Sequence, residues 1–96
     1  MKKTLLLLCL LLCTTAYGQN KIKVACVGNS VTYGAGIENR EINSYPAQLQ
    51  RMLGDGYEVV NFGKSGATLL NKGHRPYCEQ EEYKAALDFA GDRVVI

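Results

Sequence analysis

The stretch Ile22-Lys-Val-Ala-Cys-Val-Gly28 decides the fold class of this 96-residue chain. Its compact run of apolar and β-branched residues, closed by a glycine, is typical of a buried central strand in a parallel sheet. Residues 57–62 repeat this pattern before Gly63, and residues 92–96 begin a third apolar run. The sequence therefore predicts three strands, at residues 22–27, 57–62 and 92–96.

Helical patterns separate these strands. Ser44-Tyr45-Pro46 is typical of a helix start, because serine suits the N-cap and proline the first turn. The first helix is expected to end at glycines 54–56, and its apolar stripe comprises Tyr45, Leu49, Met52 and Leu53. The second is expected at about residues 79–90, with an acidic first turn and Gly91 as its stop. Its stripe comprises Tyr83, Ala86, Leu87 and Ala90.

The resulting order, β-α-β-α-β, predicts an α/β fold: a doubly wound parallel sheet with helices on both faces. Ligands of such folds bind at the carboxyl ends of the strands. Two loops are expected there, Gly28–Thr32 and Gly63–Thr68. The Gly- and Asn-rich residues 29–43 are expected to form a loop.

The N-terminus predicts secretion. Residues 1–18 combine a basic start, an apolar run at Leu5–Leu12 and small residues at Ala16 and Gly18, as in a cleaved signal peptide. The run is too short to span a membrane, so the mature chain would be residues 19–96, secreted or periplasmic. A lipoprotein anchored at Cys13 is the alternative, disfavoured by Leu12 where a small residue is expected.

Composition excludes several classes of protein. The net charge of +2 comes from Lys2 and Lys3 in the leader, so the remainder is neutral, unlike a nucleic-acid binder. A content of 47% apolar and 21% charged residues argues against disorder. With one histidine and no Cys-x-x-Cys, we expect neither a metal cluster nor a cofactor. Cys26 is expected to be a buried thiol, although a disulfide with Cys78 stays open.

Ser30 is the best-placed residue for chemistry, because it directly follows the buried strand and its N–H is free to face an anion. A serine needs a base to become nucleophilic, and Ser30 and Thr32 could instead only cap a turn or a helix start. Nucleotide-binding motifs are incomplete. Gly63-Lys-Ser65 lacks the glycine five positions earlier, and the pair Gly34 and Gly36 lacks the third glycine, at position 39.

Two segments carry a resemblance to a known family. Gly28-Asn-Ser-Val-Thr32 resembles the first sequence block of the SGNH or GDSL hydrolases, and Asn61-Phe-Gly-Lys-Ser-Gly-Ala-Thr68 resembles their second. The helix start at Tyr45-Pro46 is also similar. Asn29 and Val31 depart from the usual Asp and Leu. The resemblance covers residues 21–96 and is greatest to bacterial secreted carbohydrate esterases of the sialate O-acetylesterase-like kind.

The resemblance implies a flavodoxin-like three-layer α/β/α sandwich, of which residues 19–96 would form the first β-α-β-α-β part. It implies that Ser30 is the nucleophile and an oxyanion N–H donor, and that Gly66 supplies another oxyanion N–H. The family's Gly-x-Asn and Asp-x-x-His blocks would lie beyond Ile96. His74 could substitute as the base, although a solvated loop histidine is the preferred interpretation. Lys64 could bind an acidic sugar or be solvated.

Other residues have structural interpretations that we prefer. The tyrosines could line a sugar site, but Tyr45 and Tyr83 belong to apolar stripes facing the core. The acidic residues 79–82 could suggest carboxylate catalysis, yet they suit a solvated helix start.

The sequence thus predicts a secreted serine ester hydrolase acting on small acyl esters or O-acetylated glycans such as sialate. Residues 19–96 alone are expected to be inactive and poorly folded. The alternative is a non-catalytic carbohydrate- or anion-binding module, or a pseudoenzyme, on the same fold.

Overall fold

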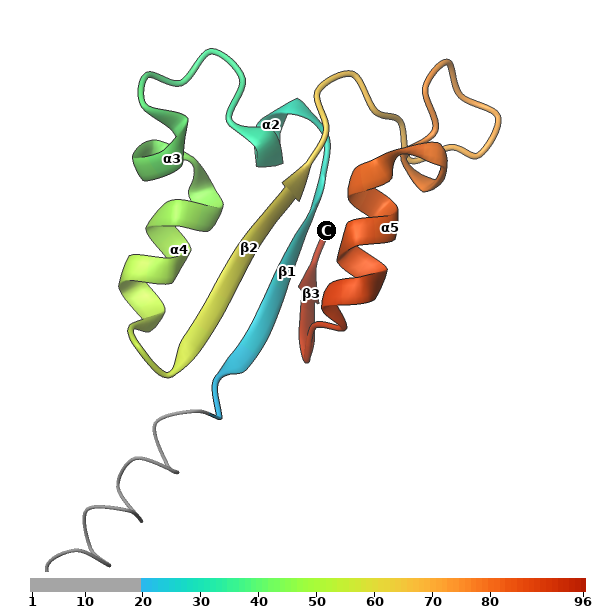
Figure 1. Cartoon of the computed structure of the whole chain (residues 1–96). Helices are drawn as coiled ribbons and strands as arrows, with labels where there is room; N and C mark the ends of the chain where they lie inside the picture. Colours follow the sequence, from blue (N-terminus) through green and yellow to red (C-terminus); the bar gives the residue numbers. More distant parts are fainter. Residues whose placement is uncertain (1–19) are drawn as a thin grey trace, which may run out of the picture.

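The computed structural model describes residues 20–96 as a parallel sheet with helices packed against it (Figure 1). Its strands are β1 (Ile22–Gly28), β2 (Tyr57–Gly63) and β3 (Arg93–Val95), in the spatial order β2-β1-β3. The expected α/β class, parallel sheet and central first strand are confirmed. The proposed signal peptide and Cys13 lie outside the described residues.

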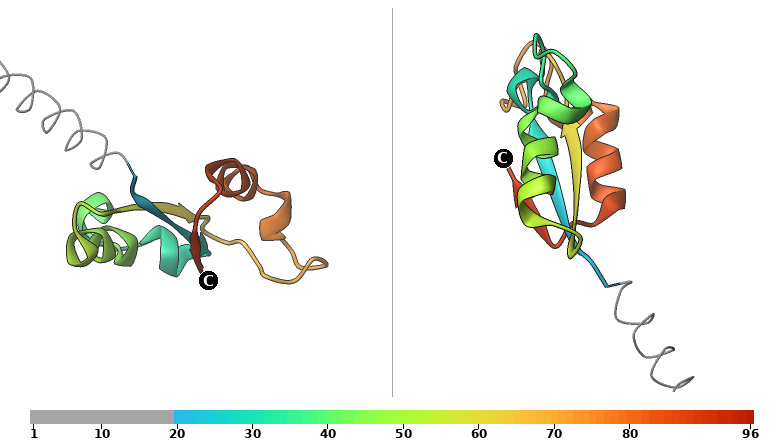
Figure 2. Two further views of the ribbon diagram at one scale, coloured as in Figure 1. Left: turned by 90° about the horizontal axis from the view of Figure 1, so that it is seen from below. Right: turned by 90° about the vertical axis from the view of Figure 1, so that its left-hand side faces the viewer.

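The two longest helices cover opposite faces of the sheet (Figure 2). Helix α4 (Tyr45–Leu53) connects β1 to β2, and α5 (Glu81–Phe89) connects β2 to β3. The sheet is therefore doubly wound, and its three layers are compatible with part of a flavodoxin-like fold. Each of these helices has nine residues, and no helix within residues 20–96 is long and apolar enough to cross a membrane.

The core is centred on β1. Val24, Ala25 and Cys26 are buried there, and Phe62 and Tyr77 are buried beside them. Cys26 is a free, buried thiol, as expected, whereas Cys78 is free and exposed, so the two are not joined. Because β1 pairs with a strand on each side, its apolar run is buried as a central parallel strand requires.

The expected loop at residues 29–43 contains two short helices, α2 (Ser30–Tyr33) and α3 (Arg40–Asn43). The prediction of a continuous loop is therefore wrong. Asn29 caps α2 through its side chain, and Gly34 ends α2 in the left-handed conformation with φ of 89°. The Asn and Gly residues that suggest a loop act here as helix ends, which have the same residue preferences.

The helix ends also depart from expectation. Ser44 occupies the N-cap of α4, but its buried side chain makes no capping hydrogen bond. The second helix, predicted from about residue 79, begins later as α5 (Glu81–Phe89), and a 3-10 turn, η1 (Tyr77–Glu79), precedes it. Helix α5 ends at Ala90 with φ of 52°, rather than at Gly91.

Three members of the predicted apolar stripes are exposed, including Ala90. Met52 is 82% exposed and Leu87 is 60% exposed. On α5, Tyr83 packs edge-on against Tyr77 with 5.9 Å between ring centroids, and Phe89 lies 5.4 Å from the ring of Phe62. The buried face of α5 is therefore centred on Tyr83 and Phe89, and it does not include Leu87 of the predicted stripe.

Candidate active site

The two loops expected to carry chemistry lie side by side at one edge of the sheet. Gly28 at the end of β1 is in register with Gly63 at the end of β2, and the Lys64 N–H donates to the Gly28 carbonyl at 2.9 Å. Ser30 is two residues beyond Gly28, and Gly66 is three residues beyond Gly63. The structure thus places both predicted site residues beyond the carboxyl ends of adjacent parallel strands.

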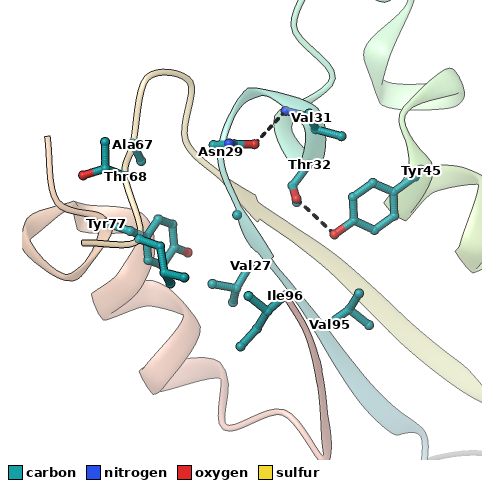
Figure 3. A pocket seen from close by; sticks show the side chains of 12 residues that line it. Val27, Asn29, Val31, Thr32, Tyr45, Ala67, Thr68, Tyr77, Val95 and Ile96 are labelled. Carbon is teal, nitrogen blue, oxygen red and sulfur yellow. Dashed lines mark hydrogen bonds between the residues drawn. The ribbon is translucent and has the colours of Figure 1, made fainter. Parts of the chain in front are cut away.

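Ser30 is the first residue of α2, a single turn of helix, and is half-buried. The Asn29 side chain accepts a hydrogen bond from the Val31 N–H at 3.1 Å and so caps this turn (Figure 3). Thr32 is buried, and its hydroxyl bonds the Tyr45 hydroxyl at 3.0 Å. Asn29, rather than Ser30 or Thr32, is therefore the N-cap of this helix. Among residues 20–96, no hydrogen bond engages the Ser30 hydroxyl or N–H.

Glycines allow α2 to lie directly against the strand ends. A β-carbon on Gly63 would collide with the backbone nitrogen of Tyr33, and one on Gly28 would collide with the Thr32 hydroxyl. Close approach of one backbone to another is a common reason for glycine. The glycines after both strands therefore determine where Ser30 can lie.

Side chains from β2 and α3 bind the carbonyls at the end of α2. The Asn61 amide donates to the Thr32 carbonyl at 2.8 Å, and its oxygen accepts from the Gly63 N–H at 2.8 Å. Arg40 donates to the Tyr33 carbonyl at 2.7 Å, and its guanidinium stacks over the Tyr33 ring at 3.7 Å. Neither Asn61 nor Arg40 has a role that the sequence predicts, because their partners lie on other elements.

Gly66 lies in a tight turn after β2. The Ala67 N–H donates to the Lys64 carbonyl at 3.1 Å, and Gly66 has φ of 81°. A positive φ at the third residue of such a turn favours glycine. Gly66 is exposed, and within the described part of the chain its N–H has no hydrogen-bond partner.

A pocket of about 470 Å³ opens beside these loops (Figure 3). It lies at the carboxyl ends of β1 and β3, where the strand order reverses, which is the usual ligand position in a doubly wound sheet. Ser30 and Gly66 do not line it, although their neighbours Asn29, Val31 and Ala67 do. The other lining residues are mainly apolar: Val27, Gly28, Thr32, Tyr45, Thr68, Leu69, Tyr77, Val95 and Ile96.

Two tyrosines contribute to this pocket, which the sequence analysis did not favour. Tyr45 and Tyr77 both line it, and Tyr77 also donates to the Phe62 carbonyl at 2.6 Å. Burial, and then the nearby Glu82 carboxylate, raise the pKa of Tyr77 to about 12. Burial also raises the pKa of Tyr45. Both hydroxyls are therefore protonated at neutral pH and able to donate hydrogen bonds.

The remaining candidate groups are engaged or lie elsewhere. Lys64 lies 3.6 Å from Glu82 of α5, so it is paired with a carboxylate, which neither expected alternative included. Burial raises the pKa of the Cys26 thiol, which disfavours the nucleophilic thiolate. Within residues 20–96, no group of three or more His, Cys, Asp or Glu residues could hold a metal ion.

His74 is exposed on a loop that projects away from the sheet (Figure 1). Hydrogen bonds of 2.8 Å close this loop, from the Thr68 N–H to the Arg75 carbonyl and from the Tyr77 N–H to the Thr68 carbonyl. This position agrees with a solvated loop histidine, which the sequence analysis preferred.

The fold and the loops define a class: an α/β protein with a pocket at the carboxyl edge of a doubly wound parallel sheet. Over 78 residues the chain is 55% identical to an acetylxylan esterase of Xylanibacter ruminicola. This alignment covers 81% of the chain but only 16% of that relative's length. No family model and no solved structure matches the chain. The chain is thus similar to a small part of a carbohydrate esterase.

Proposed function

We propose that this chain belongs to a secreted serine ester hydrolase of the SGNH or GDSL type that removes O-acetyl groups from glycans. The observation that carries the proposal is the position of Ser30, in a capped turn beyond the central strand and beside the loop of Gly66. The 55% identity to an acetylxylan esterase supports the same class of reaction.

In this proposal the Ser30 hydroxyl oxygen attacks the ester carbonyl carbon while a base takes the hydroxyl proton. The N–H groups of Ser30 and Gly66 donate to the oxyanion, where losing one donor typically costs about 10²- to 10³-fold in kcat. The bond to the sugar oxygen then breaks, and this oxygen receives the proton. Water next hydrolyses the acyl-serine, which releases acetate and restores the hydroxyl.

The base is proposed to come from outside these 96 residues. His74, the single histidine, is exposed on the projecting loop. The family resemblance assigns the base and its orienting carboxylate to an Asp-x-x-His block, and this sequence contains no such block. The alignment with 16% of the relative's length is compatible with a longer protein that supplies it.

The substrate is proposed to be an O-acetylated glycan. The name of the relative favours an acetylated xylan, whereas the motif resemblance favours an O-acetylated sialate. Lys64 is paired with Glu82, so it is not a free partner for the sialate carboxylate. Acetate release from acetylxylan and from an O-acetylated sialoside, compared at equal ester concentration, distinguishes the two substrates.

Secretion is proposed from residues 1–18. Expression of the full gene with mass analysis of the exported protein tests this point: a new N-terminus at Gln19 is expected. A lipid-modified N-terminus at Cys13 would support the lipoprotein alternative instead.

The catalytic role of Ser30 is tested with a fluorophosphonate probe, which labels activated serines covalently. In the full-length protein we expect labelling at Ser30, and loss of both labelling and acetate release in Ser30→Ala. Ser65→Ala, in the turn after β2, is the matched control and should retain labelling. A folded protein that is never labelled at Ser30 would contradict the proposal.

A binding module is the second candidate, because Ser30 does not line the pocket beside it. This alternative predicts that acetylated glycan binds without acetate release, and that Ser30→Ala binds it equally well.

A further inference from the structure

We propose that Asn61 is a positioning residue, which holds the turn carrying Ser30 in place against the loop carrying Gly66. This inference rests on the proposed esterase function and adds to it a residue that does not touch the substrate.

Asn61 connects two elements through one planar group. Its half-buried amide donates to the Thr32 carbonyl of α2 and accepts from the Gly63 N–H at the end of β2, both at 2.8 Å. The Tyr33 carbonyl lies 3.5 Å from the same amide nitrogen. The end of the turn that begins at Ser30 is therefore tied to the residue from which the loop of Gly66 departs.

Helix α2 depends on such contacts. A single helical turn is unstable alone, and its last carbonyls have no partners within the helix. Two other side chains bond α2. Tyr45 of α4 bonds the Thr32 hydroxyl, and Arg40 of α3 donates to the Tyr33 carbonyl. Asn61 instead lies on β2. Its bonds therefore fix the position of the turn carrying the Ser30 N–H relative to the loop carrying the Gly66 N–H. Misplacing reacting groups by about 1 Å can cost about 10²-fold in rate.

The chemistry of the two partners explains why an amide is required. A carbonyl needs a donor and an N–H needs an acceptor, and an amide offers both. In Asn61→Asp the ionised carboxylate offers acceptors only, so it faces the Thr32 carbonyl unfavourably. The protonated carboxyl again offers one donor and one acceptor. In Asn61→Leu the side chain offers neither a hydrogen-bond donor nor an acceptor at any pH.

The test compares these variants in the full-length protein with an acetylated glycan as substrate. For Asn61→Leu and Asn61→Asp we expect kcat to fall about 10- to 100-fold at pH 7 while KM changes less than about threefold. The kcat of Asn61→Asp, divided by the wild-type kcat at the same pH, should rise as the pH falls from about 7 to about 5. The corresponding ratio for Asn61→Leu should stay constant.

The neighbouring charges are controlled in the same comparison. Arg40, Glu41 and Arg51 line the groove next to Asn61, and they are present in both variants. Recovery of Asn61→Asp at low pH that exceeds any change in Asn61→Leu therefore reports the restored donor. Equal ratios at all pH values would overturn the inference.

A stability control separates positioning from general destabilisation. Val24→Ala removes buried volume in the middle of β1, so it should lower the melting temperature but leave kcat within about threefold. Hydrogen exchange at residues 30–34 should accelerate in Asn61→Leu and not in Val24→Ala. Unchanged exchange there would overturn the positioning role. Wild-type protein without acetate release would instead overturn the proposed function, and exchange would then decide the positioning role by itself.

Discussion

Gly63 lies at the end of β2, where the backbone of Tyr33 crosses it without room for a side chain. In Gly63→Ala the new methyl group must displace α2. We expect a loss of about 1–3 kcal/mol in the free energy of unfolding, typical of overpacking, and slower fluorophosphonate labelling of Ser30. Urea unfolding and labelling rates of the full-length protein measure the two effects.

Gly56→Ala is the matched control for this prediction. A β-carbon at Gly56 would meet no atom within 4 Å, and its φ is not positive. We expect it to leave stability and labelling nearly unchanged. Equal effects of the two substitutions would show that the close contact of α2 with Gly63 affects neither stability nor labelling.

The raised pKa of Tyr77 predicts that the folded protein loses stability at alkaline pH. Its pKa is about 12 in the folded protein and about 10 in the unfolded chain, so the folded state holds the proton more tightly. Its contribution is complete below about pH 10 and decreases as the pH rises from about 10 to about 12. The ionised phenolate also loses the hydrogen bond to the Phe62 carbonyl.

Tyr77→Phe isolates this contribution. At neutral pH we expect it to lower the free energy of unfolding by about 0.5–1.5 kcal/mol, because the hydrogen bond from the Tyr77 hydroxyl to the Phe62 carbonyl is lost. The stability advantage of wild type over Tyr77→Phe should then shrink above about pH 10. Urea unfolding of both full-length proteins between pH 8 and pH 11 gives this difference, and a constant difference would refute the assignment.

At the scale of the elements, strand β2 lies at one edge of the sheet, and helix α4 packs against its outer side. The Gln50 amide donates to the Tyr57 carbonyl at 2.9 Å and accepts from the Val59 N–H at 2.7 Å. A neighbouring strand would bond the same pair of residues, two apart in sequence. Gln50 therefore occupies part of the edge through which other chains could add a strand.

We expect Gln50→Leu to cost about 1–3 kcal/mol in unfolding free energy, because two backbone groups lose their partners. The freed edge should also increase self-association, measured by light scattering. Gln48→Leu is the control, since Gln48 is exposed on the same helix and bonds only the Asn43 carbonyl. Loss of stability without self-association would mean that another feature also protects this edge.

At the scale of the whole molecule, residues 19–96 by themselves are expected to be inactive and poorly folded. On β3 and directly after it, Val94 is 58% exposed and Ile96 is 86% exposed, and such an apolar edge favours aggregation. The single histidine, His74, is also exposed. General-base assistance alone is worth about 10²- to 10⁴-fold.

Expression of residues 19–96, followed by thermal unfolding and p-nitrophenyl acetate hydrolysis, tests this prediction. Aggregation or a broad transition is expected, with no turnover above background. A monomer with a cooperative transition and turnover that Ser30→Ala abolishes would contradict it, and would imply that a group within these residues acts as the base.

By itself, the sequence determined the order of the three strands and the two longest helices, the parallel sheet and the loops that lie at its carboxyl edge. These features follow from local patterns: the apolar runs of β1 and β2, the glycine at the end of each, and the helical spacing between them. Ser30 and Gly66 could be named as candidates because their positions depend only on which residue follows which strand. Their roles remain predictions.

Only the tertiary structure decided how the candidate site is held together. Asn61 bonds Thr32, 29 positions away in the sequence, and Lys64 pairs with Glu82 of α5. Met52 fits an apolar stripe by spacing but faces solvent. Each of these outcomes depends on which surfaces meet after the chain has folded, and residue spacing along a single element carries no information about a partner on another element.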